Sequence, residues 1–369
     1  MFIALREIRR SIGRFALLTG AVALLVVLLL FFQAVAGSLT LGLTGGIENN
    51  SADVLAYSDR ARRNPAASFL PPGTGQTIAA VDGVGRTSEV GRLALSAADE
   101  DVVVIGLSDP EFGGPAELAD GRRAAGAGEA VVSSSSLSTG FDVGDTVTAA
   151  GVELTVVGTA DDAAFDVSPT FYVPFDDYAA MVAERAGVAS VDEVAVPVSW
   201  VAVEAADGVD PAELAAAISG AVDGIEALDR NRAVSELPGV GQVTQSFNIL
   251  YLLLFIVVTI VTGVFFLILT VQKQRSLVLF RAIGAGRRDV VAPVLFQVLA
   301  VVGLGSLLGA LVAGLLLNAA RDTFGSALDL RTTVLTIGFL LVLGVAASVG
   351  AVRRVLAIDP IEATTAGTV

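Results

Sequence analysis

The side chains that usually perform catalysis are scarce in this sequence. It contains no His and no Cys, so the commonest general base, the thiolate nucleophile and the usual zinc ligands are missing. Its single lysine, Lys273, does not follow the Gly-x4-Gly pattern of a phosphate-binding loop. The four serines at 133–136 have no base nearby, and we interpret them as a helix N-cap after a strand. We predict that the chain is not an enzyme, does not hydrolyse ATP itself, and has no cofactor, metal site or nucleic-acid partner.

Four segments without any charged residue are long enough to cross a membrane. They are 15–36, 249–271, 290–317 and 333–352, and a helix that crosses the hydrocarbon layer needs roughly 20 apolar residues. Proton- or ion-coupled carriers usually have an ionisable residue within the membrane, and these four segments have none. If the protein moves a substrate, we expect the energy to come from elsewhere.

Charge predicts how the chain is oriented. The N-terminal flank, the 272–289 loop and the C-terminal tail together hold 11 basic and 4 acidic residues, whereas 41–245 holds 10 basic and 32 acidic ones. Basic loops stay in the cytoplasm, so both termini and the 272–289 loop are predicted to be inside the cell. The acidic domain is predicted to be outside, where its charge either attracts cationic substrates or only keeps the surface soluble.

The predicted fold is a membrane protein of four transmembrane α-helices, with one large α+β extracytoplasmic domain inserted between helices 1 and 2. The predicted segments are an amphipathic cytoplasmic-face helix (1–14), span one (15–40), the extracytoplasmic domain (41–245), span two (246–271), an inner loop (272–289), span three (290–318), a short outer loop (319–332), span four (333–352) and a cytoplasmic tail (353–369). Two points stay open. Ala34-Val35-Ala36 is similar to a signal-peptidase site, and 1–14 is either an interfacial helix or only a topogenic charge cluster.

The outer domain mixes strands and helices. Residues 102–107, 152–158 and 200–204 are rich in β-branched side chains and bounded by Asp and Gly, which predicts strands. Residues 142–147 predict a turn into a strand that pairs with 153–157. Residues 175–185 and 211–223 predict helices, the second with Asp210 as its N-cap and Pro211 at its start.

The inner loop is the most informative segment, and it resembles a known family. Its Arg281-Ala282-Ile283-Gly284-Ala285, followed by Arg287-Arg288, is similar to a signature of the FtsX/MacB-type permeases of type VII ABC systems. Three other segments resemble further motifs of that family, and all of the motifs occur along this chain in the family's order. These segments are residues 4–8, Val143-Gly144-Asp145-Thr146-Val147 and residues 358–363. Gln297, where many members have Glu, and the opening residues are more similar to the HrtB/DevC branch, some of whose members export haem.

The resemblance implies an ABC exporter permease with a separate dimeric ABC ATPase and a second copy of itself or a related permease as partners in the cell membrane. The inner loop is then the ATPase-coupling site; from the residues alone, a loop that only sets topology is an equal alternative. The predicted coupling residues are Val278, Leu279, Arg281, Ala282, Ile283, Gly284, Arg287 and Arg288. The alternative function is an FtsX-like signal transmitter that controls an extracytoplasmic protein without transport.

The substrate class that the resemblance implies is hydrophobic or amphipathic: haem-like, lipid, peptide or drug. For haem, the candidate ligands are Tyr57, Tyr172, Tyr178, Tyr251 and Met181. Tyr251, at the outer end of span two, is the one candidate substrate contact, with interfacial anchoring as its other reading.

Small residues repeat at four-residue spacing in spans three and four. They are Gly305, Gly309, Ala313, Gly344 and Ser348, and such spacing lets helices approach closely. Packing within one protomer and a dimer seam are both open.

Overall fold

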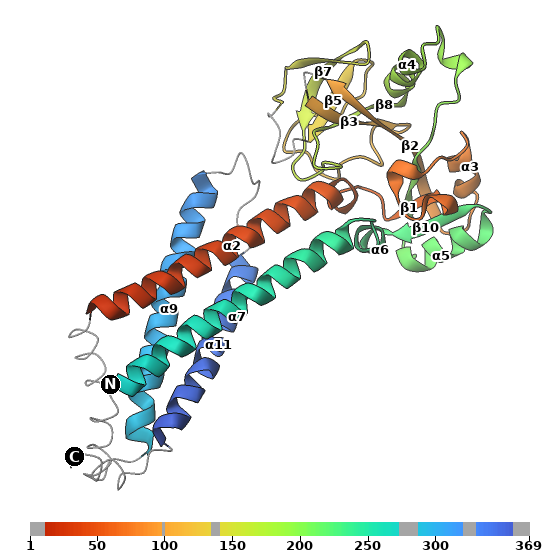
Figure 1. The fold of residues 1–369 in the computed structure, drawn as a ribbon. Helices are drawn as coiled ribbons and strands as arrows, with labels where there is room; N and C mark the ends of the chain where they lie inside the picture. The colour runs from red at the N-terminus through yellow and green to blue at the C-terminus, as the bar shows by residue number, and fades with distance from the viewer. Residues whose placement is uncertain (1–11, 98–99, 134–140, 273–286, 320–329, 357–369) are drawn as a thin grey trace, which may run out of the picture. The chain divides into compact units, whose positions relative to one another are not determined.

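The computed structural model describes residues 12–97, 100–133, 141–272, 287–319 and 330–356. Four long helices stand out in it (Figure 1): α2 (Ile12–Glu48), α7 (Val240–Gln272), α9 (Arg287–Ala319) and α11 (Leu330–Leu356). Each contains a segment long and apolar enough to cross a membrane, with mean hydropathy between 2.0 and 2.9. The chain divides into a helical unit and a sheet unit, and the sheet unit comprises Ala36–Thr244.

The helical unit has an apolar core that all four helices share. Valines and leucines of α2 and α9 are fully buried in it, together with Phe266 of α7 and Leu340 of α11. Large apolar side chains such as Leu17, Leu24 and Leu311 remain exposed on the outside of the helices, where lipid would replace water. The prediction of four long apolar helices is confirmed.

Among the described residues of the sheet unit, ten strands form one mixed sheet. Its order is β10-β1-β9-β2-β3-β8-β5-β7-β4, with β6 paired to β7. The strands are β1 (Val54–Ser58), β2 (Val84–Ala97), β3 (Glu100–Leu107), β4 (Asp120–Gly121), β5 (Glu129–Ser133), β6 (Thr146–Ala149), β7 (Val152–Thr159), β8 (Thr170–Pro174), β9 (Trp200–Ala205) and β10 (Ile225–Asp229). The helices are α3 (Thr74–Ala79), α4 (Phe175–Ala186), α5 (Pro211–Ala221) and α6 (Arg230–Ser235), with 3₁₀ turns η1 (Asp59–Ala61), η2 (Pro65–Ala67) and η3 (Val191–Glu193).

Four of these strands form a split βαβ arrangement. Strands β10, β1, β9 and β2 are neighbours in that order and all pair antiparallel, while α3 connects β1 to β2 and α5 connects β9 to β10. This is the connectivity of a ferredoxin-like fold. Strands β3 to β8 and helix α4 are inserted between its second and third strands, and this insertion has an apolar core of its own around Leu154, Phe171 and Met181.

The local sequence signals in this unit were good guides. Strands β3, β7 and β9 lie where β-branched runs predicted them, and β6 pairs antiparallel with β7 as expected. Helix α5 begins at Pro211, and the Asp210 carboxylate accepts hydrogen bonds from the amides of Ala212 and Glu213. The α+β class of the domain between the first two long helices is therefore confirmed.

Candidate functional site

The predicted ATPase-coupling residues lie almost wholly outside the described residues. Val278, Leu279, Arg281, Ala282, Ile283 and Gly284 belong to the 273–286 segment, of which the structure says nothing. Arg287 and Arg288 are the first two residues of α9, and their side chains are outside the description. Coupling through this loop stays a prediction.

The small residues of span three lie on the face of α9 that meets α2. A Cβ added to Gly305 would stand 2.8 Å from Val22 Cγ1, and one added to Gly309 would stand 2.6 Å from the Ala23 carbonyl oxygen. Ala313 is buried as well. The two backbones thus approach too closely for any larger residue, and the contact is within one chain.

Spans three and four meet at another small residue. A Cβ on Gly344 of α11 would lie 3.0 Å from Val302 of α9. Ser348 lies on the same helix, but its side chain is outside the described part. Phe255 of α7 packs edge-on against Phe339 of α11 at a centroid distance of 4.8 Å.

Tyr251, the candidate substrate contact, is a half-buried residue of α7. Its hydroxyl donates to the backbone carbonyl of Phe32 on α2 at 3.2 Å. A second polar contact joins α2 to α11, where the Gln33 amide donates to the Thr336 hydroxyl at 3.0 Å. In this structure the Tyr251 hydroxyl therefore serves to join two helices.

The other candidate haem ligands are core residues. Tyr57, Tyr172, Tyr178 and Met181 are each at most 2% exposed. The Tyr172 hydroxyl donates to the Ala163 carbonyl at 2.6 Å and the Tyr178 hydroxyl to the Pro197 carbonyl at 2.9 Å. Burial raises the pKa of all three tyrosines, which opposes formation of a phenolate ligand.

A site that sequence reasoning missed lies within the sheet unit, at the C-terminal end of α2. We call it the α2 anchor: residues 42–50 together with the 160–168 loop between β7 and β8. Added Cβ atoms would press against Val167 from Gly42, collide with the Asp162 carbonyl from Gly45, and collide with the Phe165 ring from Gly46. Glycine at these three positions is what lets the loop lie directly on the helix.

Hydrogen bonds fasten the anchor. The Gly46 amide donates to the Ala164 carbonyl at 2.9 Å, and the Val167 amide donates to the Gly42 carbonyl at 2.8 Å. The Asn49 side-chain amide donates to the Asp162 carbonyl at 2.5 Å. The loop is thus held to α2 by main-chain and side-chain bonds.

Two carboxylates of the 160–168 loop, Asp162 and Asp166, have different electrostatic surroundings. Burial, and then the nearby carboxylates of Asp161 and Glu48, raise the pKa of Asp162. Asp166, further along the loop, forms an ion pair with Arg92 of β2, whose own pKa is lowered by burial. The 160–168 loop therefore contains one carboxylate, Asp162, whose charged form is disfavoured, and another, Asp166, which is ion-paired to the sheet.

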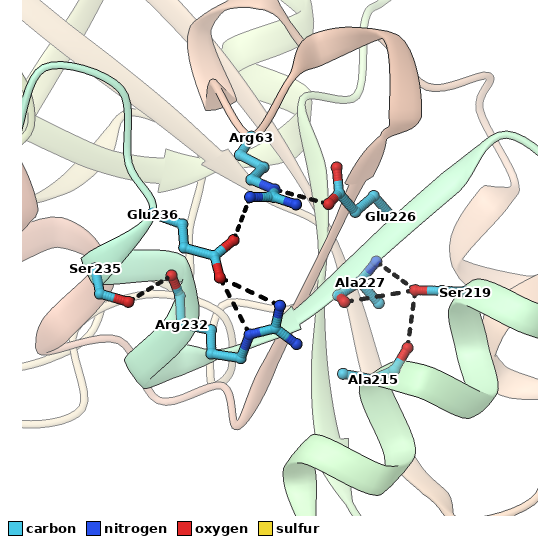
Figure 2. Close-up of polar contacts among 8 residues, drawn as sticks. All are labelled: Arg63, Ala215, Ser219, Glu226, Ala227, Arg232, Ser235 and Glu236. Atoms are coloured by element: carbon cyan, nitrogen blue, oxygen red, sulfur yellow. Dashed lines mark hydrogen bonds and ion pairs between the residues drawn. The ribbon is translucent and has the colours of Figure 1, made fainter.

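A second fastening, shown in Figure 2, involves α6, the short helix that precedes α7. Arg63 pairs with Glu226 of β10 at 2.7 Å and with Glu236 at 2.5 Å, and Arg232 reaches Glu236 at 3.2 Å. These two carboxylates raise the pKa of Arg63. We call these four residues the Arg63 cluster; it ties the end of α6 to the sheet.

Beside this cluster, the Ser219 side chain of α5 forms hydrogen bonds with the backbone of the edge strand β10. Its hydroxyl accepts from the Ala227 amide at 2.8 Å and donates to the Ala215 carbonyl at 2.9 Å, as Figure 2 shows. An unpaired strand edge is a template for pairing with another chain, and here its central amide is already satisfied.

Comparison with known families decides what kind of protein carries this arrangement. Residues 15–221, more than half of the chain, match the MacB-like periplasmic core domain, and residues 248–360 match the FtsX-like permease C-terminal domain. The chain belongs to the MacB/FtsX family of ABC transporter permeases. It is therefore a multi-pass membrane protein whose sheet unit corresponds to a periplasmic core domain. Both matched domains are permease domains and neither is an ATPase, in agreement with the prediction that the chain does not hydrolyse ATP.

Curated relatives of this MacB/FtsX-type permease match over part of their length. Uncharacterized ABC transporter permeases of Mycobacterium tuberculosis and Mycobacterium bovis are 30% identical over 139 residues, which is 37% of this chain and 39% of theirs. The match spans well under half of those relatives.

Two solved structures of extracytoplasmic regions are similar to this permease. The periplasmic region of MacB from Actinobacillus actinomycetemcomitans is 12% identical with a TM-score of 0.34, covering 50% of this chain and 91% of that one. The extracellular domain of the noncanonic ABC-type transporter YknZ from Gram-positive bacteria is 19% identical with a TM-score of 0.30, covering 48% and 100%.

Proposed function

We propose that this permease is the membrane subunit of an ATP-driven exporter and works by transmitting motion. Two copies, or one copy and a related permease, pair with two separate ATPase subunits. The 272–289 loop docks on the ATPase, and the long helices carry its closure to the extracytoplasmic domain. That domain expels a hydrophobic or amphipathic substrate from the outer leaflet.

One observation carries this proposal most directly. Helix α2 runs without interruption from Ile12 to Glu48, and its last turns are gripped by the 160–168 loop of the sheet unit. A helix is stiff along its axis, so a displacement of its apolar part is passed to the residues of the α2 anchor. The described core of the helical unit is rich in Val, Leu and Phe. This composition supports helices that transmit motion rather than helices that line a polar pore.

The orientation follows from charge. The basic residues of both termini and of the 272–289 loop support an orientation in which these three segments lie in the cytoplasm. This puts the coupling loop on the side where ATP is found.

The substrate class remains broad: haem-like, lipid, peptide or drug. Assignment to the HrtB/DevC branch rests on Gln297, a buried residue of α9, and on the opening residues. Because Tyr57, Tyr172, Tyr178 and Met181 are core residues, haem would have to bind without them. A haem titration with a Soret shift that Tyr251→Phe abolishes supports a haem branch; no shift removes haem from the class.

The alternative is a signal transmitter, in which the extracytoplasmic domain controls another protein. What binds the sheet unit separates the two functions. Purified permease in nanodiscs that retains a small apolar molecule favours export, and stable capture of an extracytoplasmic enzyme favours signalling.

Docking is tested by co-purification. The full chain is co-expressed with each ABC ATPase found among the neighbouring genes, and the complex is measured by size exclusion and by the rate of ATP hydrolysis. Ile283→Asp with Gly284→Asp is expected to abolish the complex, and Gln274→Asp in the same loop is expected to leave it intact. Equal complex formation by both variants contradicts docking through this loop, and no complex with wild type contradicts the exporter and the transmitter together.

A further inference from the structure

The 160–168 loop contains a turn whose residues do not suit its conformation. Asp166 and Val167 have φ of 54° and 60°, and the Ser168 amide donates to the Phe165 carbonyl at 3.0 Å. Positive φ at both central positions marks a type I′ turn, for which Asn-Gly is strongly preferred. A β-branched residue such as Val167 is a genuine outlier there. Strain of this kind persists only where the surroundings impose it.

The surroundings here are the last turns of α2. The Val167 amide bonds to the Gly42 carbonyl and the Gly46 amide to the Ala164 carbonyl. Gly42 and Gly46 are four residues apart, so these are the two groups that a regular α-helix joins to each other. Because α2 is helical throughout Ile12–Glu48, both groups can be satisfied within the helix if the turn withdraws, whereas the Val167 amide and the Ala164 carbonyl then lose their partners on α2.

The engaged and the withdrawn turn differ in backbone strain and in the contacts that they make. Withdrawal relieves two left-handed residues, but it gives up the Asp166–Arg92 ion pair and the contact of Val167 with Gly42. Withdrawal also breaks the hydrogen bonds of the Val167 amide to Gly42 and of the Ala164 carbonyl to Gly46.

We propose that the turn of residues 165–168 is a strained latch, in which Asp166 and Val167 position the end of α2 against the sheet. When the latch is engaged, the Val167 amide is bonded to Gly42. When it is released, the turn relaxes and the Val167 amide loses its partner, while the Gly46 amide stays within the helix. The purpose of the latch, to pass motion of α2 to the domain, rests on the proposed function; its geometry does not.

Residue-resolved hydrogen exchange on the full chain in detergent, without any ATPase, tests the latch. In wild type, the amide of residue 167 is expected to exchange at least about tenfold faster than that of Gly46, after correction for intrinsic rates, because only the former loses its partner on release; tenfold corresponds to ~1.4 kcal/mol. If the two amides exchange together, the helix end simply frays, and the latch is refuted.

The decisive variant gives the turn its preferred residues, Asp166→Asn with Val167→Gly, and it is compared with Asp166→Asn alone, which loses the same ion pair with Arg92. We expect the amide of residue 167 to exchange about tenfold more slowly in the double variant than in Asp166→Asn alone, with Gly46 unchanged. Ala164→Gly is the matched control, since it adds a glycine to the same loop at a position without positive φ; it is not expected to slow residue 167. Slowing in the control, or none in the Asn-Gly variant, overturns the inference. Emission from Trp200, whose ring packs against Phe165 at a centroid distance of 5.6 Å, verifies that each variant is folded.

A second arm adds the partner ATPase and ATP. Wild type is expected to exchange residue 167 faster during ATP turnover, and the Asn-Gly variant is expected to respond at least about threefold less at equal ATPase binding. An equal response in both removes the latch from transmission. If no ATPase binds at all, the proposed function fails, while the exchange experiments without ATPase still decide whether the latch exists.

Discussion

Two glycine-to-alanine substitutions on the same helix should shift stability in opposite directions. Gly37 of α2 is exposed, and an added Cβ would meet nothing within 4 Å. Alanine there should stabilise the helix by about 1 kcal/mol, because glycine has the lower helix propensity. Gly45 has the same intrinsic preference, but its Cβ would collide with the backbone carbonyl of Asp162.

The size of the Gly45→Ala effect follows from what has to move. Overpacking against a fixed backbone costs about 2 kcal/mol, and displacement of the loop gives up the Asn49–Asp162 hydrogen bond, about 1 kcal/mol more. Less the propensity gain of about 1 kcal/mol, the net loss is about 2 kcal/mol. For a domain of this size that is a fall of roughly 4–8 °C in Tm, against a rise of roughly 2–4 °C for Gly37→Ala.

The chain provides its own probe for this measurement. Trp200 is its single tryptophan and is 1% exposed in the sheet unit, so thermal unfolding followed by intrinsic fluorescence reports on that unit alone. If Gly45→Ala raises Tm as much as Gly37→Ala does, the loop does not lie on α2 as described, and the reasoning about the α2 anchor is wrong.

Three further substitutions test other parts of the account. Asp162→Asn should raise Tm at pH 7, because the raised pKa of Asp162 means that the folded domain binds the proton more tightly than the unfolded chain does. The contribution of Asp162 to wild-type stability should therefore rise as pH falls from above the folded pKa towards the ordinary value near 3.8. If the variant has the same pH dependence of stability in this window as wild type, the assignment to Asp162 is wrong. Glu236→Gln should lower the free energy of unfolding by at most about 1 kcal/mol, and Tm with it, because the ion pairs of the Arg63 cluster are partly exposed. In 0.5 M salt the difference in Tm between wild type and variant should become smaller. An unchanged Tm at low salt shows that the cluster does not fasten α6. Gly309→Leu should reduce the yield of folded, monodisperse protein by gel filtration, whereas Gly314→Leu, where a Cβ meets nothing within 4 Å, should not; equal yields argue against the close α2–α9 contact.

The sequence predicted those parts of the fold that depend on local composition. The four apolar helices follow from length and hydropathy, and the β6–β7 hairpin and the Asp210 cap follow from neighbouring residues. What it did not predict depends on distant partners. Strand β1 pairs with β10 across some 170 residues, and a ferredoxin-like order interrupted by six strands leaves no local signal.

The α2 anchor could have been suspected in part. Gly42, Gly45 and Gly46 follow an apolar span so closely that a close approach of another segment was a reasonable expectation. Its partner was hidden, because Val167 with positive φ contradicts every local preference. Arg63 was hidden for a related reason: its carboxylate partners, Glu226 and Glu236, are brought to it only by the sheet.

The central claim is that ATP turnover in a partner subunit changes the extracytoplasmic domain through the α2 anchor. Because Trp200 is the single tryptophan and packs on Phe165 of the anchor loop, permease labelled with 5-fluorotryptophan gives one ¹⁹F resonance in a complex with unlabelled ATPase. The account predicts that this resonance shifts or splits when ATP is added and returns after hydrolysis, and that the Asp166→Asn, Val167→Gly variant greatly reduces the change. A resonance that stays the same while the wild-type complex hydrolyses ATP contradicts it.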